Sequence, residues 1–284
     1  MPISRKRRKP KRNIFLTLLN IFIITLILSV VISAAIVFFI VKDALTDLPE
    51  IDPTVYTFTE NSQILDSEGN FLAMIYDGNL RKEVKYEDIS KDAINALVAI
   101  EDRTFWRHEG FNYVRLLGAI RDSIVSESDI SGTSTITQQL ARNTFLRDTM
   151  SERSFYRKIR EAYYAMQIEE ALPKEDIITA YMNTIFLGAN TDGYESASRI
   201  YFSKTAKDLN FMEGAVLACI PKAPTDFAPM YPKERGRITS DDVIVGTRDS
   251  QYYYIYNETI EDRYKYVLSL MLEQEYITQE QYDT

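Results

Sequence analysis

A glutamate at position 101 lies where a carboxylate could act as a general base. Ile94 and Leu97 precede it by seven and four residues, so all three side chains share the apolar face of a helix. A carboxylate on such a face is costly unless it is paired or its pKa rises, and this environment can make a carboxylate basic near neutral pH. The alternative for Glu101 is an ion pair with Arg103 or Arg107 at a frayed helix end.

A second carboxylate, Glu161, follows a strongly basic stretch. Residues 142–160 contain two negative residues and six positive ones, which are Arg142, Arg147, Arg153, Arg157, Lys158 and Arg160. Because a guanidinium presents a fixed fork of donors to phosphate, this net charge of +4 predicts a site for a phosphate or pyrophosphate group. The alternative is a solvated helix face on which Arg157 and Glu161 form a weak surface pair.

A polar stretch between the two carboxylates could bind sugar hydroxyls or phosphates. Residues 134–139 have the sequence STITQQ. Ser134, Gln138 and Gln139 supply more hydrogen-bonding groups than a simple buried helix start needs. We therefore expect these three side chains to contact the substrate.

Composition excludes several classes of function. His108 is the only histidine and Cys219 the only cysteine, so the chain has no zinc motif and no internal disulfide, and any metal needs oxygen ligands. Cys219 lies in an apolar run, which predicts that it packs in the core. Seven of the 33 Lys and Arg residues lie in the first 12 residues. The rest of the chain has 26 Lys and Arg and 41 Asp and Glu, which gives it a net charge of −15. This charge indicates that nucleic acid is not a partner.

The N-terminus has the pattern of a membrane anchor. Residues 1–13 form a basic tail without acids, and residues 14–41 contain no charged residue. As a helix, this segment would extend about 42 Å, more than the roughly 30 Å of a hydrocarbon core. Positive flanks stay in the cytoplasm, so we expect a single-pass protein of the cell membrane with an extracytoplasmic catalytic domain. A cleaved signal peptide is the alternative, although its apolar region is normally only about 7 to 15 residues.

The rest of the chain is predicted to be mainly helical. Turn-forming residues 66–70 predict a β-hairpin within a segment of linker and short strands that covers residues 42–89. Residues 90–284 are expected to form one domain, with a strand-rich insertion over residues 233–258 and a further helix from about residue 261. Apolar periodicity predicts helices over residues 91–102, 111–127, 135–146, 152–171, 174–186, 193–201 and 208–220.

The chain resembles the peptidoglycan glycosyltransferase domain of family 51, which occurs in class A penicillin-binding proteins and in monofunctional transglycosylases. Five blocks carry the resemblance in this order: EDRTFWRHEG, GTSTITQQLARN, RKIREAYYAMQIEE, KEDIITAYMNTIFLGANTDGYESASRIYFSK and LNFMEGAVLACIPKAPTDFAPMYP. Together they cover about residues 101–232. One departure is Arg142, where the family usually has lysine; the charge is kept but the geometry differs.

The resemblance implies a lysozyme-like, two-lobed helical domain that joins lipid II units and releases undecaprenyl pyrophosphate. Glu101 matches the general base, and Glu161 matches the glutamate that assists the leaving group directly or through a divalent cation, Mg²⁺ or Mn²⁺, whose ligands are not identified. The substrate-binding positions, with Ser134 added from the polar stretch, are Gln138, Gln139, Arg142, Arg153 and Arg157. No organic cofactor is implied. The expected partners are lipid II, the growing lipid-linked glycan strand, the membrane and other cell-wall synthesis proteins.

Two alternatives belong to other functional classes. A lytic transglycosylase or a lysozyme-like glycan hydrolase would have a similar fold and a catalytic glutamate, but it needs neither a basic pyrophosphate site nor a membrane anchor. An inactive membrane-anchored scaffold for cell-wall assembly would not need both glutamates. The 284 residues contain no Ser-x-x-Lys motif, so no penicillin-binding activity is predicted for them. The chain ends abruptly at Thr284, as the front part of a longer protein would.

Overall fold

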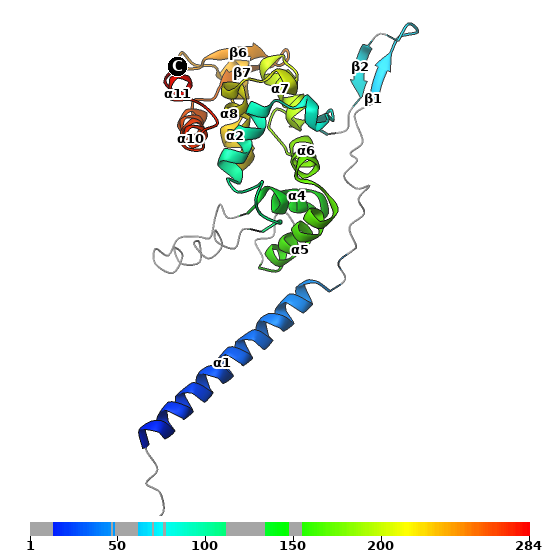
Figure 1. Cartoon of the computed structure of the whole chain (residues 1–284). Coiled ribbons are helices and arrows are strands. Elements are labelled where there is room, and N and C mark those ends of the chain that lie inside the picture. The colour runs from blue at the N-terminus through cyan, green and yellow to red at the C-terminus, as the bar shows by residue number, and fades with distance from the viewer. Residues whose placement is uncertain are drawn as a thin grey trace, which may run out of the picture. The chain divides into compact units, whose positions relative to one another are not determined.

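The structure, a computed structural model, describes residues 14–46, 48, 62–69, 71–75, 78–111, 134–147 and 155–284. The chain divides into two compact units, Met1–Pro49 and Glu50–Thr284 (Figure 1). The first unit contains the N-terminal helix and the second contains the candidate site.

One apolar helix, α1 (Ile14–Ala44), forms most of the described part of the first unit. It has 31 residues, with a mean hydropathy of 3.0 in its most apolar stretch. At about 1.5 Å per residue it is roughly 46 Å long, which exceeds a hydrocarbon core of about 30 Å. Apolar side chains such as Phe22 and Ile27 are exposed along it. By length and composition α1 can cross a membrane, and it ends three residues beyond the expected limit at residue 41.

The second unit is mainly helical, as expected. Its α-helices are α2 (Lys91–Glu101), α4 (Ile136–Phe145), α5 (Phe155–Ala171), α6 (Lys174–Thr184), α7 (Tyr194–Phe202), α8 (Phe211–Cys219), α9 (Pro224–Phe227), α10 (Ile260–Glu273) and α11 (Gln279–Asp283). The 3₁₀ helices are η2 (Tyr86–Asp88), η4 (Ala206–Asp208), η5 (Ile220–Lys222) and η6 (Arg235–Arg237). Six predicted helices correspond to α2 and to α4 through α8, with ends that differ by at most three residues. The helix predicted over residues 111–127 lies, apart from Phe111, outside the described residues.

Capping side chains define the starts of several helices. Asn210 and Glu213 form a capping box, in which the Asn210 side chain accepts the Glu213 N–H at 2.9 Å. Because this box fixes the first turn, α8 begins at Phe211, three residues later than predicted. The residues before it form the separate helix η4. Ser90 caps the start of α2, because its side chain accepts the N–H of Asp92 at 3.2 Å.

The described strands are short and form three small sheets. β1 (Ser62–Leu65) and β2 (Phe71–Ile75) form the predicted antiparallel hairpin. β3 (Leu80–Arg81) and β4 (Thr191–Asp192) form a parallel pair, which was not predicted because two-residue strands carry no periodic pattern. The third sheet is antiparallel with the order β5-β7-β6, and it begins three residues before the segment expected to be rich in strands, residues 233–258. Its strands are β5 (Met230–Glu234), β6 (Ile244–Thr247) and β7 (Tyr252–Tyr256).

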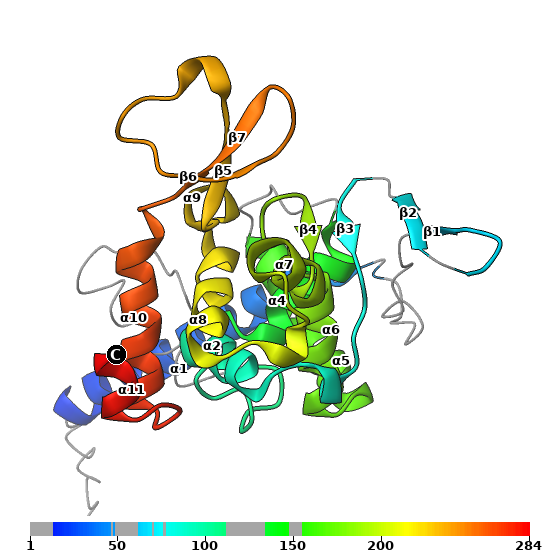
Figure 2. The same cartoon turned by 90° about the horizontal axis from the view of Figure 1, so that it is seen from above.

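The helices of the second unit pack in two groups that α7 connects. Helices α2, α8 and α10 form the first group, whose core includes Ala96, Ala215 and Met271. A Cβ on Gly214 of α8 would lie 2.8 Å from the Cα of Ala93 on α2, so this close approach requires glycine. Helices α4, α5 and α6 form the second group, and α7 contacts both α6 and α8. Figure 2 shows α8 between α10 and the second group. The arrangement agrees with the two lobes that were expected.

Cys219 packs in the core of the first group, as predicted. The side chain is fully buried, and its thiol donates to the carbonyl oxygen of Ala215 at 3.1 Å. Burial raises the pKa of the thiol to about 12, while the charge of Arg263 acts in the opposite direction. The thiol is therefore protonated and structural at physiological pH.

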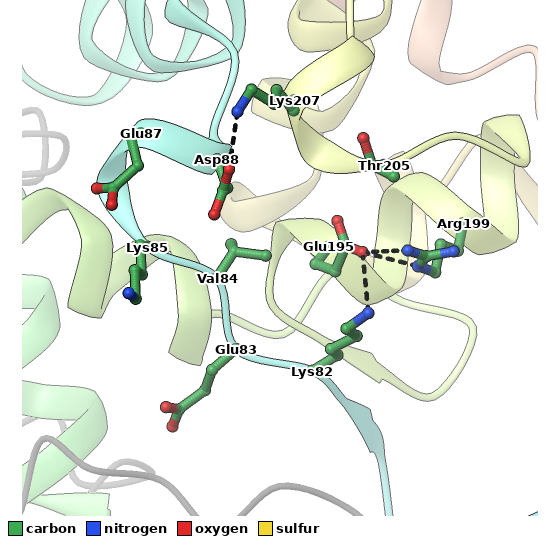
Figure 3. A pocket seen from close by; sticks show the side chains of 10 residues that line it. All are labelled: Lys82, Glu83, Val84, Lys85, Glu87, Asp88, Glu195, Arg199, Thr205 and Lys207. Atoms are coloured by element: carbon green, nitrogen blue, oxygen red, sulfur yellow. Dashed lines mark hydrogen bonds and ion pairs between the residues drawn. The ribbon is translucent and has the colours of Figure 1, made fainter. Parts of the chain in front are cut away.

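A cavity of about 800 Å³ lies between the segment that precedes α2 and helix α7 (Figure 3). Glu195 on its wall is buried and pairs with Arg199 at 2.6 Å and with Lys82 at 3.7 Å. Asp88 pairs with Lys207 at 2.9 Å. These pairs compensate most of the charge around the cavity. None of its lining residues belongs to the clusters around Glu101 and Glu161.

Candidate active site

Glu101 is the last residue of α2, and its carboxylate is held from two sides. Gln139 on α4 donates from Nε2 to Oε2 of Glu101 at 2.7 Å. Arg263 on α10 places Nη2 at 3.7 Å from Oε1, and the Glu101 side chain is 15% exposed. These contacts provide the pairing that a carboxylate on an apolar face needs. The alternative pair with Arg103 does not form, because Arg103 pairs with Glu273.

A buried tyrosine holds Gln139 in turn. Tyr181 on α6 donates its hydroxyl hydrogen to Oε1 of Gln139 at 2.9 Å and is fully buried. Burial raises the pKa of Tyr181 well above its usual value, and the negative charge of Glu101 raises it further, while Arg142 acts in the opposite direction. The phenol therefore stays protonated and remains a donor at physiological pH.

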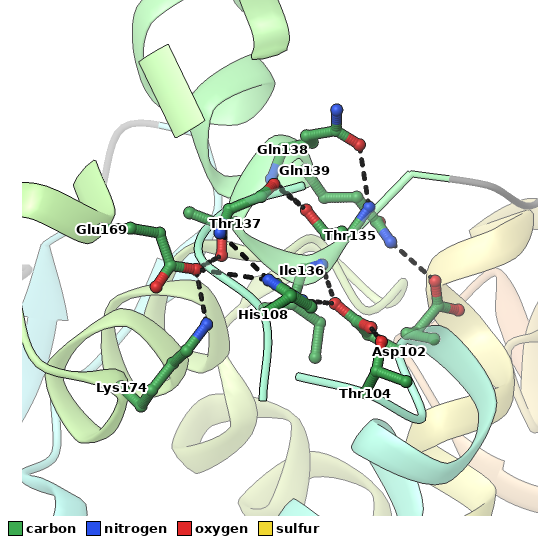
Figure 4. Close-up of polar contacts among 12 residues, drawn as sticks. Asp102, Thr104, His108, Thr135, Ile136, Thr137, Gln138, Gln139, Glu169 and Lys174 are labelled. Atoms are coloured by element: carbon green, nitrogen blue, oxygen red, sulfur yellow. Dashed lines mark hydrogen bonds and ion pairs between the residues drawn. The ribbon is translucent and has the colours of Figure 1, made fainter. Parts of the chain in front are cut away.

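Asp102 connects the end of α2 to the start of α4 (Figure 4). Its carboxylate is fully buried and accepts the N–H of Ile136 at 3.1 Å, at a helix end where the dipole favours an anion. Nε2 of His108 lies 2.7 Å from the same oxygen, and the N–H of Gly110 donates to Nδ1 of His108 at 3.0 Å. Because Nδ1 is an acceptor, Nε2 carries the proton and donates to Asp102.

The loop after α2 also packs closely against α4 and α5. Gly110 has a φ of +81°, and a Cβ there would lie 2.8 Å from the carbonyl oxygen of Ala165 on α5. Glycine is therefore required on both counts. The hydroxyl of Thr135 donates to the carbonyl oxygen of Gly110 at 2.9 Å. These contacts hold the loop that follows Glu101 against the second helix group.

Gln138 has a structural partner in the same region. Thr135 and Gln138 form a capping box: Oε1 of Gln138 accepts the N–H of Thr135 at 3.0 Å, and the Thr135 hydroxyl oxygen accepts the N–H of Gln138 at 3.1 Å. This box starts α4 and so orients Gln139 one residue later. Substrate binding by Gln138 stays a prediction.

Glu161 on α5 is fully buried between two cations. Its Oε1 lies 3.1 Å from Nε of Arg157, and its Oε2 accepts from Nζ of Lys158 at 2.6 Å. Nζ of Lys158 also donates to the hydroxyl oxygen of Ser134 at 2.9 Å. The alternative of a solvated helix face is therefore wrong for Arg157 and Glu161, because the Arg157 side chain is only 11% exposed. A buried carboxylate needs such partners to offset its lost hydration.

The structure brings most of the predicted site residues into two clusters. Glu101 and Gln139 belong to the first cluster, which also contains Tyr181. The charge of Arg142 on α4 acts on this tyrosine and opposes the rise in its pKa that burial causes. Ser134, Arg157 and Glu161 belong to the other. Arg153 lies outside the described residues.

Several contacts of these clusters were not predicted from the sequence. Asp102 and His108 lie in the first sequence block, EDRTFWRHEG. Polar side chains so close to the candidate base are a sequence signal for residues that hold it in position. Tyr181 looked like one more apolar position of a helix. Arg263 had no sequence signal, because its contact with Glu101 depends on how α10 packs against α2.

The described residues do not form a site that fits the expected divalent cation. No group of three or more His, Cys, Asp or Glu side chains among them is arranged to hold a metal. The oxygens of Glu161 face Arg157 and Lys158, which are cations themselves. Magnesium and manganese prefer several oxygen ligands. The cation stays a prediction.

This mainly helical domain thus has one carboxylate held at a helix end and another among basic side chains. The chain belongs to the transglycosylase family, whose model matches residues 68–247. This confirms the family that the five sequence blocks predicted, and the domain is a glycosyltransferase.

Similar proteins include penicillin-binding proteins. Penicillin-binding protein 1A of Clostridium botulinum is 34% identical over 99% of this chain, which covers 31% of that protein. Penicillin-binding protein 1A of Clostridium acetobutylicum is 40% identical over 76% of this chain and 27% of its own length. A crystal structure of penicillin-binding protein 1A from Haemophilus influenzae is 21% identical, with a TM-score of 0.38 over 80% of this chain and 20% of that one. The chain thus spans only part of the length of these relatives.

Proposed function

We propose that this domain polymerises lipid II into glycan strands and releases undecaprenyl pyrophosphate. In this reaction the 4-hydroxyl of an incoming lipid-linked disaccharide attacks the anomeric carbon of the growing strand. The new carbon–oxygen bond forms while the bond to the pyrophosphate oxygen breaks, and the pyrophosphate keeps that electron pair. The observation that carries the proposal is the held carboxylate of Glu101 in a domain of the transglycosylase family.

Glu101 is the general base in this proposal. A base must be fixed within reach of the proton that it removes and must retain a lone pair for that proton. The contacts with Gln139 and Arg263 fix the carboxylate, and a carboxylate oxygen can take up a proton. Its partial exposure gives the acceptor hydroxyl access. Glu101 takes the hydroxyl proton as the oxygen attacks.

The cluster around Glu161 stabilises the leaving group in this proposal. Negative charge develops on the pyrophosphate as its bond breaks, and fixed cations nearby lower the energy of that state. Glu161 holds Arg157 and Lys158 beside each other, so it assists departure through these cations. Arg142 and Arg153 add positive charge around the phosphates.

The remaining predicted residues bind the rest of the substrate. Ser134, Gln138 and Gln139 contact sugar hydroxyls or phosphates in this proposal. Lys158 joins Ser134 to the Glu161 cluster, which supports a single binding surface for the donor.

We also propose that α1 anchors the protein in the cell membrane, with the basic tail in the cytoplasm and the catalytic domain outside. The length and apolar composition of α1 support anchoring, and the positive residues before it support the orientation. The partners are then lipid II, the growing lipid-linked strand and other proteins of cell-wall synthesis.

Incubation of the purified protein with lipid II in detergent tests the proposed reaction. We expect glycan strands and free undecaprenyl pyrophosphate from lipid II alone. A glycan hydrolase would instead shorten preformed strands without consuming lipid II, and a scaffold would do neither. A folded protein that leaves lipid II unchanged would overturn the proposal.

A further inference from the structure

Gln139 can support an ionised Glu101 in only one orientation of its amide group. An amide carries a donor, Nε2, and an acceptor, Oε1, on the same carbon. In the structure Nε2 donates to Glu101 and Oε1 accepts from Tyr181, at 2.7 and 2.9 Å. A rotation by half a turn would place Oε1 against the carboxylate, and two acceptors would then repel each other. The observed orientation is therefore the favourable one beside an ionised Glu101, and the hydroxyl of Tyr181 holds the amide in it by donating to Oε1.

We propose that Tyr181 is a positioning residue, which keeps the N–H of Gln139 directed at Glu101 and so keeps the base oriented. This inference rests on the proposed role of Glu101 as general base. Tyr181 has no contact with the reacting atoms in this scheme. It acts through Gln139, from a different helix.

Charged and titratable groups on several helices act on Glu101 or on Tyr181, and their effects must be separated from the effect of a change at Tyr181. Arg263 on α10 lies 3.7 Å from Oε1, and Arg142 on α4 acts on Tyr181. Tyr194 on α7 is a second buried phenol whose pKa is raised well above its usual value, first by burial and then by the charge of Glu101. Both phenols stay protonated at the pH values used to measure polymerisation, so Tyr181 remains a donor throughout.

Tyr194 provides a matched control for Tyr181. Both side chains are fully buried, and Glu101 affects the pKa of both. The difference is that the hydroxyl of Tyr194 has no hydrogen-bond partner among the described residues. Tyr194→Phe therefore removes the same oxygen from a similar environment without breaking a hydrogen bond.

The pH dependence of lipid II polymerisation by Tyr181→Phe and Tyr194→Phe tests the proposal. A hydrogen bond to the ionised form favours that form, so its loss lets Glu101 take up a proton more readily. For Y181F we expect kcat to fall by about fivefold to tenfold, KM to stay near the wild-type value, and the acidic limb of the rate profile to move to higher pH by about half a unit. For Y194F we expect the wild-type profile.

A double-mutant cycle separates positioning from a general effect on folding. Because Tyr181 acts through Gln139, Y181F should cause no further loss in a Gln139→Ala background. Assays below the melting temperature of every variant keep the comparison valid even if Y181F is less stable. An unmoved acidic limb in Y181F, an equal shift in Y194F, or additive losses in the cycle would each overturn the proposal.

The same assays distinguish this inference from the proposed function. If the wild-type protein does not polymerise lipid II, or if Glu101→Gln remains active, the function or the base is wrong, and the inference about Tyr181 falls with it. If the wild type is active, E101Q is inactive and Y181F behaves like Y194F, only the role of Tyr181 is wrong.

Discussion

Loss of the Glu101 carboxylate should remove catalysis and leave folding nearly unchanged. Glu101→Gln keeps the shape of the side chain and still offers Gln139 an acceptor oxygen, so the melting temperature should change little. Without a base, polymerisation should fall by about 10²-fold to 10⁴-fold, measured as the rate of lipid II consumption. Glu109→Gln changes an exposed carboxylate of the same motif and should keep wild-type activity. An E101Q variant with most of its activity would contradict the base assignment.

Substitution of Arg142 is the most specific test of phosphate recognition by a single side chain. Arg157 is less suitable, because its loss would also deprive the buried Glu161 of a partner. Arg142→Gln should weaken the binding of lipid II by about tenfold and leave a phosphate-free glycan fragment nearly unaffected, as calorimetry or fluorescence titration would show. Arg147→Gln, at an exposed position, should cause a smaller loss. Equal losses of both ligands in R142Q would instead favour the hydrolase alternative.

Between elements, the contact that matters most is the one from Asp102 to the start of α4. It ties the helix that ends in Glu101 to the helix that carries Gln139. Asp102→Asn removes a buried charge that Ile136 and His108 both use, so the free energy of unfolding should fall by about 2 kcal/mol, measured by denaturant titration.

A surface carboxylate gives the control for this prediction. Asp88→Asn changes an exposed pair with Lys207 and should leave the unfolding curve nearly unchanged. Activity should also fall in D102N at temperatures where it is folded, because Glu101 and Gln139 lose their common support. A D102N variant as stable and active as D88N would show that the α2–α4 link is not needed.

The elements also show how far the sequence predicts the fold. Helices α2 and α4 were predictable because a periodic apolar face and a capping residue agree at each start. The parallel pair of β3 and β4 was not, since its strands have two residues each and lie far apart in the chain. The same limit applies to the site: Glu101 and Glu161 follow from motif and charge, whereas Arg263 and Tyr181 become visible only when α10 and α6 pack.

At the scale of the whole molecule, α1 should do more than attach the protein to a surface. Lipid II and the growing strand both carry a polyprenyl chain in the bilayer, so anchoring the enzyme in the same bilayer raises the local concentration of substrate. Removal of residues 1–41 should therefore reduce polymerisation strongly on lipid vesicles and only slightly in detergent, where the substrate is no longer confined to a bilayer.

The comparison of vesicles with detergent needs equal amounts of protein and substrate, and thermal melting must show that the shortened protein is folded. The same 284-residue chain, with α1 replaced by an unrelated apolar helix of the same length, is the matched control. If concentration at the membrane is the whole effect, this chimera should regain the activity on vesicles, because confinement depends on length and hydrophobicity and not on the order of the side chains. A shortened protein that polymerises equally well in both settings would show that α1 contributes nothing to catalysis.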